Sequence, residues 1–121
     1  MKTLYSLTLA AALIAGQAQA ACTYPKAPEK IPDGSTSTLE QMLAGQKEVK
    51  AFDSAITTYQ SCLETQFNES VAAKPDMTPE ARQELEKIRD QKMNSAVDEA
   101  QAVADQLNAQ IRVWKEKNAK K

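Results

Sequence analysis

Cys22 and Cys62 are the two cysteines of the sequence, and their thiols could form a disulfide, carry a lipid or bind a metal. They lie 40 positions apart, so they do not make the Cys-x-x-Cys motif of a redox enzyme. Without a third or fourth ligand they do not make a structural zinc site either. In an oxidising compartment, two lone cysteines of a small domain usually pair. We therefore predict an intramolecular disulfide between Cys22 and Cys62.

Cys22 has two alternative fates. Ala20, Ala21 and Cys22 place a cysteine after two small residues, as the attachment site of an exported lipoprotein does, although Gln19 stands where such a signal usually carries Leu. Lipidation of Cys22 is therefore the first alternative to the disulfide. An intermolecular bridge through Cys22 is the second.

The other polar residues do not form a catalytic or metal-binding pattern. The sequence has no histidine, which removes the commonest general base and the commonest zinc ligand. The carboxylate pairs Glu84 with Glu86 and Asp98 with Glu99 have spacings that point the two side chains of a helix in different directions. The sequence therefore predicts a protein that is not an enzyme and that binds no metal or cofactor.

The C-terminal end of the sequence is basic. Arg112, Lys115 and Lys117 surround Trp114, and the next basic residues are at the very end of the chain. A basic helix with an aromatic residue could contact anionic lipid or cell-wall polysaccharide. Basic residues also stabilise a helix C-terminus by compensating the helix dipole. We treat Arg112, Trp114, Lys115 and Lys117 as candidate interaction residues.

The first twenty residues have the pattern of a signal peptide. Lys2 precedes an apolar run from Leu4 to Ala15, and Ala18-Gln19-Ala20 offers the small residues before a signal-peptidase cut. The run is too short for a stable membrane span. We expect residues 1–20 to be removed, so that the mature chain begins at Ala21 in the periplasm or outside the cell.

The rest of the composition is that of an ordinary soluble domain. Charged residues make up 26% of the 121 residues and hydrophobic residues 42%. Without Lys2, the mature chain has 14 basic and 16 acidic side chains. This balance does not favour nucleic acid as a partner. Only three glycines and six aromatic residues point away from β architectures.

Residues 21–37 are predicted to form an extended N-terminal arm. Three prolines and the turn sequence Pro32-Asp33-Gly34 exclude a helix there. A helix from Thr38 to Cys62 would rise about 36 Å. The arm can span about 50 Å in polyproline geometry, so it can fold back along the helix and bring Cys22 to Cys62.

A first helix is predicted at about residues 38–72, capped by Ser37 or Thr38, each of which has Glu or Gln three residues on. Its apolar seam recurs with heptad spacing and comprises Met42, Val49, Phe52, Ile56, Tyr59 and Leu63. Gly45, on this seam, indicates the close approach of a neighbouring backbone. Pro75 ends the helix.

A second helix is predicted at about residues 79–117, because Thr78, Pro79 and Glu80 favour a helix N-terminus. We expect it to fray near Asn118. Its apolar stripe has a period near 3.6 and an alanine-rich middle, and it comprises Leu85, Ile88, Ala96, Ala100, Val103, Leu107, Ile111 and Trp114.

Two such helices joined by a short connection must form a long antiparallel hairpin, so the predicted fold is all-α: one helical hairpin with coiled-coil-like packing over residues 38–121, preceded by the arm. A two-helix hairpin has a thin core, and we expect Leu43, Phe67, Val97 and Val113 to stay partly exposed. The arm, or a second copy of the chain in a homodimer, would complete the burial.

Part of the sequence resembles a group of small exported proteins of Gram-negative bacteria. The resemblance covers roughly residues 22–65 and consists of Cys22-Thr-Tyr-Pro, Ile31-Pro-Asp-Gly, Met42, Gln46, Val49-Lys50, Phe52 and Tyr59-Gln-Ser-Cys62-Leu63. It implies export to the periplasm. It implies no activity and no functional residue.

The sequence therefore predicts a non-enzymatic periplasmic interaction protein that binds another protein or a second copy of itself. Its exposed apolar strips would let it act like a holdase chaperone, which binds unfolded chains. The alternative is an envelope-associated structural protein that contacts membrane or cell wall through the basic C-terminal tail.

Overall fold

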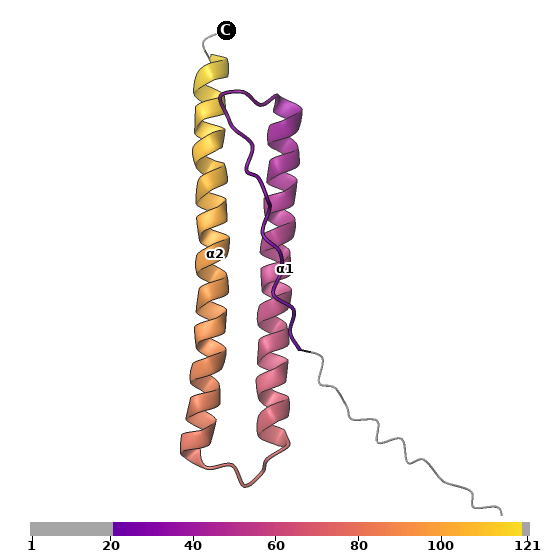
Figure 1. Cartoon of the computed structure of the whole chain (residues 1–121), viewed down its shortest axis with the longest axis vertical. Helices are drawn as coiled ribbons and strands as arrows, with labels where there is room; N and C mark the ends of the chain where they lie inside the picture. Colours follow the sequence, from indigo (N-terminus) through magenta and orange to yellow (C-terminus); the bar gives the residue numbers. More distant parts are fainter. Residues whose placement is uncertain (1–20, 120–121) are drawn as a thin grey trace, which may run out of the picture.

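The computed structural model describes residues 21–119, in which helix α1 (Leu39–Ala72) and helix α2 (Pro79–Ala119) pack against each other. The two helices run antiparallel along most of their length (Figure 1). The described part of the chain contains no β-strand. The predicted all-α hairpin is confirmed. The predicted signal peptide, residues 1–20, and the last two residues lie outside the described range.

Thr38 caps the start of α1. Its hydroxyl accepts a hydrogen bond from the Gln41 backbone N–H at 3.2 Å, and the Gln41 side chain accepts one from the Thr38 backbone N–H at 2.8 Å. This reciprocal pair is a capping box, and it identifies Thr38 rather than Ser37 as the cap. At the other end, Ala73 ends the helix before Pro75.

Thr78 caps the start of α2, where its hydroxyl accepts from the Ala81 backbone N–H at 3.2 Å. The helix continues to Ala119, slightly beyond the predicted end at residue 117. At Asn118, where fraying was expected, the side-chain amide donates to the Trp114 carbonyl at 2.8 Å. This side-chain bond to a carbonyl one turn earlier lies within the last two turns of α2.

The buried residues of α1 follow the predicted seam and extend it past Leu63 to Phe67. They are Met42, Gly45, Val49, Phe52, Ile56, Tyr59, Leu63 and Phe67. The expectation that Phe67 stays partly exposed was wrong, since it is 8% exposed. The guanidinium of Arg89 lies 4.4 Å above the Phe67 ring and covers it. An arginine from α2 therefore closes this end of the core.

Helix α2 contributes fewer buried side chains. Ala96 is fully buried at the centre, and Val103 and Leu107 continue the contact toward the C-terminus. Ala96 belongs to the alanine-rich middle of the predicted stripe, and this part of the stripe contributes to the core. Ile88 was expected in the stripe but is 41% exposed. It lies at the edge of an open groove beside Tyr24 and Tyr59, where one side of its side chain still meets solvent.

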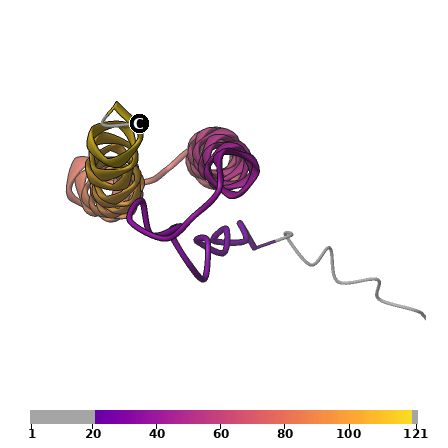
Figure 2. The same ribbon diagram turned by 90° about the horizontal axis from the view of Figure 1, so that it is seen from above.

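The arm, residues 21–37, forms a third layer on the hairpin. It runs back along α1 from the turn at the top of the molecule, and the view along the helices places it on one side of the helix pair (Figure 2). Cys22, Ala27 and Ile31 of the arm pack against the core. The hairpin is therefore covered on one face, and this asymmetry determines which surfaces remain available.

Candidate functional site: the arm and the groove beneath it

A disulfide between Cys22 and Cys62 attaches the beginning of the arm to the middle of α1. The two Cα atoms lie 5.7 Å apart, and both residues are half-buried. The predicted pairing is present in the structure. Because Cys62 is next to the buried Leu63 on α1, the bridge holds the arm directly over the edge of the core.

Tyr24 provides the next contact between the arm and the helices. Its ring meets that of Tyr59 edge to face, with centroids 5.0 Å apart, and its hydroxyl donates a hydrogen bond to the Glu99 carboxylate of α2. Partial desolvation, together with the Glu99 hydrogen bond and charge, raises the pKa of Tyr24 to about 12. The phenol therefore stays neutral and bridges α1 to α2.

Pro32 lies against Gly45 of α1. A Cβ atom added to Gly45 would lie 2.5 Å from the Cγ atom and 2.6 Å from the Cδ atom of Pro32. Gly45 therefore allows a close approach, as the sequence indicated, but the neighbour is a proline ring of the arm and not the expected backbone. The Pro32 ring can take this position only because Gly45 has no side chain.

Gly34 places the turn of the arm directly on the backbone of α2. Its N–H donates to the Gln110 side-chain oxygen at 2.9 Å, and a Cβ atom at this position would overlap the Gln110 carbonyl oxygen. The sequence predicts Gly34 only as part of a turn. The contact with α2 was missed because it joins residues 76 positions apart, and no local pattern reports such a contact.

Asp33 organises the same turn. Its backbone carbonyl accepts from Thr36 and Ser37, and its side-chain oxygen accepts from the Ser35 backbone N–H at 2.8 Å and the Ser35 hydroxyl at 2.6 Å. The hydrogen bonds from Ser35 lower the pKa of the Asp33 carboxyl. Lys117 of α2 donates to the Ser35 carbonyl. We call Asp33, Gly34, Ser35, Gln110 and Lys117 the clasp.

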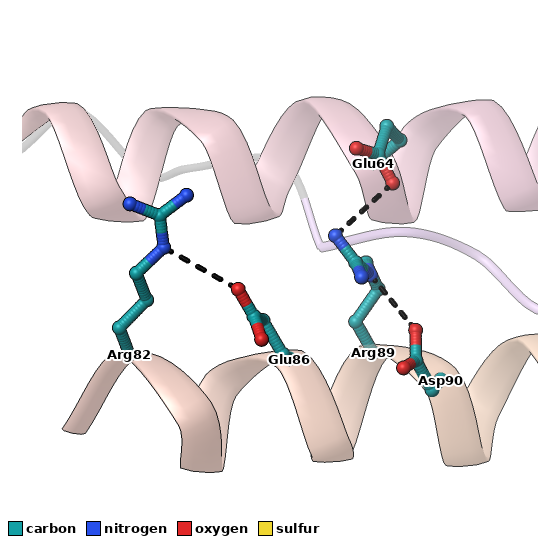
Figure 3. A network of polar contacts seen from close by, with 5 residues as sticks. All are labelled: Glu64, Arg82, Glu86, Arg89 and Asp90. Atoms are coloured by element: carbon teal, nitrogen blue, oxygen red, sulfur yellow. Dashed lines mark hydrogen bonds and ion pairs between the residues drawn. The ribbon is translucent and has the colours of Figure 1, made fainter. Parts of the chain in front are cut away.

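Arg89 joins the helices at the far end of the hairpin (Figure 3). Besides covering Phe67, it pairs with Glu64 of α1 at 3.4 Å and with its neighbour Asp90 at 3.0 Å. The Asp90 hydrogen bond is the main reason that the pKa of Arg89 is raised, so the guanidinium keeps its charge. Arg82, seven residues or about two turns earlier on α2, pairs with Glu86 on the same helix.

The four candidate interaction residues of the C-terminal end do not act as one group. Lys117 belongs to the clasp, and Trp114 is half-buried where Gly34 contacts α2. Arg112 and Lys115 are exposed, and their spacing places them on one face of α2. Part of the basic surface expected from the sequence therefore holds the arm in place.

Several large apolar side chains are exposed on the helices. We call four of them the outer apolar residues: Leu39 (54% exposed), Leu43 (54%), Val97 (48%) and Val113 (37%). Leu43, Val97 and Val113 were expected to be exposed, and they are. Leu39 and Leu43 are one turn apart on α1, so they form a continuous apolar strip.

Polar side chains of the described residues contact one another in pairs and small networks. Within residues 21–119, no three Cys, Asp or Glu side chains lie close enough together to hold a metal ion. Of the carboxylate pairs considered, Glu86 pairs with Arg82 and Glu99 accepts from Tyr24. No described helix combines the length and apolarity needed to cross a membrane. What the described part of the chain does present is a set of apolar surfaces, one covered by the arm and the others open.

Comparison of the chain with known protein families, with curated proteins and with solved structures finds no match.

Proposed function

We propose that this chain is a non-enzymatic periplasmic interaction module that binds apolar segments of other polypeptides, as a holdase does. The observation that carries the proposal is the strip formed by Leu39 and Leu43, each 54% exposed although the helix has a well-packed seam on its other face. Exposed apolar strips on long helices bind apolar parts of partner proteins. Val97 on α2 offers a further apolar contact.

Two features support a location outside the cytoplasm. Disulfides persist in oxidising compartments, and the two cysteines of this chain form a disulfide with each other. Residues 1–20 have the pattern of a secretory signal. Cell fractionation and N-terminal sequencing test this part of the proposal, with a mature N-terminus at Ala21 as the expected result.

Binding is tested with the purified mature chain and an aggregating client such as citrate synthase. We expect wild-type protein to suppress light scattering by the client, and Leu39→Gln with Leu43→Gln to weaken the suppression. Lys47→Gln with Lys50→Gln is the matched control, since these exposed residues lie on the same helix. Equal activity of wild type and the leucine variant would contradict the proposal. Crosslinking in intact periplasm would then be used to identify natural partners.

The same strip could instead be covered by a second copy of the chain, which is the homodimer form of this proposal. Sedimentation of the mature chain at micromolar concentration distinguishes the two forms. A dimer that dissociates in the Leu39→Gln and Leu43→Gln variant would indicate self-association. A monomer at all concentrations would leave the strip available to other proteins.

The second candidate function is envelope attachment through the basic C-terminal tail. Arg112 and Lys115 favour it, because both are exposed on one face of α2. Lys117 and Trp114 favour it less, because both contact the arm region. If Arg112→Gln with Lys115→Gln abolishes binding to anionic vesicles or peptidoglycan, the attachment function is supported. If the wild type does not bind either surface, it is excluded.

A further inference from the structure

We propose that the arm is a redox-released strap: reduction of the Cys22–Cys62 disulfide by an external dithiol frees residues 21–37 and opens the groove beneath them to an extended segment of another polypeptide. The inference rests on the proposed function, because it adds a second, regulated binding surface to the same interaction module. It concerns the covered face of the hairpin and not the outer apolar residues.

The surface beneath the arm is the apolar core itself. Cys22, Ala27 and Ile31 pack on a cluster formed by Val49, Phe52, Ile56, Tyr59, Leu63, Ala96, Val103 and Leu107. None of these eight residues is more than 9% exposed while the arm is in place. The view along the helices shows the arm on one side of the helix pair (Figure 2). Removing the arm would therefore uncover a long apolar groove between α1 and α2.

The arm shows what kind of ligand this groove takes. It is a single extended segment without regular secondary structure, and it places the small or apolar side chains of Ala27 and Ile31 against the helices. Gly45 removes a side chain at the point where the Pro32 ring enters. A groove shaped for one extended chain fits an extended segment of another polypeptide better than it fits a helix or a folded surface.

The covalent and hydrogen-bonded contacts of the arm with the helices lie at its two ends. The disulfide and Tyr24 hold the beginning, and the clasp holds the turn. Between them, Lys26 and Glu29 pair with each other at 2.6 Å, and their side chains are 80% and 78% exposed. An exposed pair within the arm contributes little to its attachment. Apart from the backbone that leads into α1 at Thr38, the disulfide is the one covalent link between the arm and the described helices, and its cysteines are only half-buried.

The chemistry is ordinary thiol–disulfide exchange. A thiolate of the dithiol attacks one sulfur of the Cys22–Cys62 bridge, and the other cysteine leaves as a thiolate that takes up a proton. The second thiolate of the reductant then displaces the remaining cysteine. Two electrons pass from the dithiol, which ends as a disulfide, to the protein, which ends with two thiols. Reoxidation by a disulfide reverses the step and refastens the arm.

In the oxidised chain the disulfide still ties Cys22 to Cys62 when the rest of the arm lifts from the helices, so the opened arm remains a closed loop. Reduction removes this constraint. Because α1 stays folded, the flexible part of the loop is the arm from Cys22 to Thr38, and for a loop of about 15 residues the chain-entropy model favours the open arm by about a hundredfold. Trypsin cleavage after Lys26 and Lys30 reports the opening. We expect cleavage in the arm to accelerate by about that factor in the reduced chain, while α-helical circular dichroism stays constant.

Binding is measured with reduced, carboxymethylated lactalbumin, a permanently unfolded protein without free thiols. Four forms of the mature chain are compared: oxidised, dithiol-reduced, the Cys22→Ser and Cys62→Ser double variant, and a form whose two sulfurs are joined by a methylene group. The last form keeps the arm attached in the presence of a dithiol and controls for effects of the reductant. We expect tighter binding by the reduced chain and the double variant than by the oxidised and methylene-bridged chains.

Three outcomes overturn the proposal. Equal binding by all four forms would mean that the groove under the arm is not a binding surface, while the proposed function through the outer apolar residues would stand. Loss of helix on reduction would mean that the arm is part of the fold and not a strap. Absence of binding by every form would contradict this inference and the holdase function together.

Discussion

Gly34 lies very close to the backbone of Gln110 in α2. A Cβ atom added to Gly34 would overlap the backbone carbonyl oxygen of Gln110 and lie 2.8 Å from the backbone nitrogen of Trp114. No described glycine has a positive φ, so the requirement for glycine here is one of space and not of backbone conformation. The Gly34 N–H also donates to the Gln110 side chain at 2.9 Å. The contact fixes the turn of the arm to the C-terminal half of α2.

Gly34→Ala should therefore lift the turn from α2. We expect a loss of about 1–3 kcal/mol in the free energy of unfolding, the usual cost of overpacking a tight contact, measured by urea denaturation. Thr36→Ala is the matched control, because Thr36 is exposed and only its backbone bonds to Asp33. The control should change stability by less than about 0.5 kcal/mol. Equal effects of the two variants would contradict the close contact.

The hairpin could be predicted from the sequence because its determinants are local or periodic. The heptad spacing from Met42 to Leu63 specifies the buried face of α1, and Thr38 and Thr78 specify the two helix starts. Phe67 and Ile88 were assigned to the wrong environments. Their burial depends on where the Arg89 side chain and the arm lie across the groove, and residue spacing within one helix does not contain that information.

Gly45→Ala provides a second prediction, because helix propensity and packing oppose each other there. Alanine in a helix interior is favoured over glycine by about 1 kcal/mol. In this chain the new methyl group would lie 2.5 Å from the Pro32 ring, so we expect net destabilisation in the wild-type background. In the Pro32→Ala background the ring is absent, and Gly45→Ala should stabilise by about 1 kcal/mol.

A double-mutant cycle of Gly45→Ala and Pro32→Ala measures this coupling from four thermal or urea unfolding curves. A coupling energy above about 1 kcal/mol is expected for residues in direct contact. Additive effects of the two substitutions would show that Pro32 does not pack on Gly45 in solution.

The alkaline stability of the protein should depend on Tyr24. Its pKa is raised from 10.0 to about 12, first by desolvation and then by Glu99, so the folded state favours the neutral phenol. The stability from this contact is therefore fully present below pH 10 and is lost as the pH rises toward 12. Ultraviolet absorbance of the phenolates gives the pKa, with Tyr24→Phe assigning the signal.

Glu99→Gln tests whether Glu99 contributes to the raised pKa of Tyr24. The substitution removes the negative charge but keeps an oxygen that can accept from the Tyr24 hydroxyl, so we expect the pKa of Tyr24 to move toward 10. Titration of Tyr24 that is unchanged by this substitution would show that the hydroxyl does not meet Glu99.

Arg89 should contribute more to thermal stability than Arg82, although both form ion pairs on α2. Arg89 pairs with Glu64 of the other helix and covers the Phe67 ring, whereas Arg82 contacts Glu86 of its own helix (Figure 3). We expect Arg89→Ala to lower the melting temperature by several degrees and Arg82→Ala to have little effect. Similar shifts for both variants would mean that Arg89 does not join the helices.

The candidate site was less predictable than the fold. The disulfide could be predicted because the length of an extended arm and the length of a helix both depend only on the number of residues. The Glu99 contact with Tyr24 and the Lys117 contact with Ser35 join residues 75 and 82 positions apart. Lys117 was therefore grouped with the basic tail on composition, whereas the structure also gives it a place in the clasp.

Removal of the disulfide provides the last prediction. The bridge closes a loop between residues 40 positions apart. In the chain-entropy model such a crosslink stabilises the folded state by about 4 kcal/mol, because it restricts the unfolded chain. Small domains are stable by only about 5–15 kcal/mol, so Cys22→Ser with Cys62→Ser should lower the urea midpoint strongly. The double variant avoids a free thiol that could form dimers.

The denaturant slope distinguishes this mechanism from a simple loss of contacts. An uncrosslinked chain unfolds to a more expanded state, so the slope should increase in the double variant while the midpoint falls. Wild-type protein unfolded in the presence of a dithiol should match the variant in both quantities. A lower midpoint with an unchanged slope would place the effect in the folded state, where Cys22 packs against the core, and not in the unfolded chain.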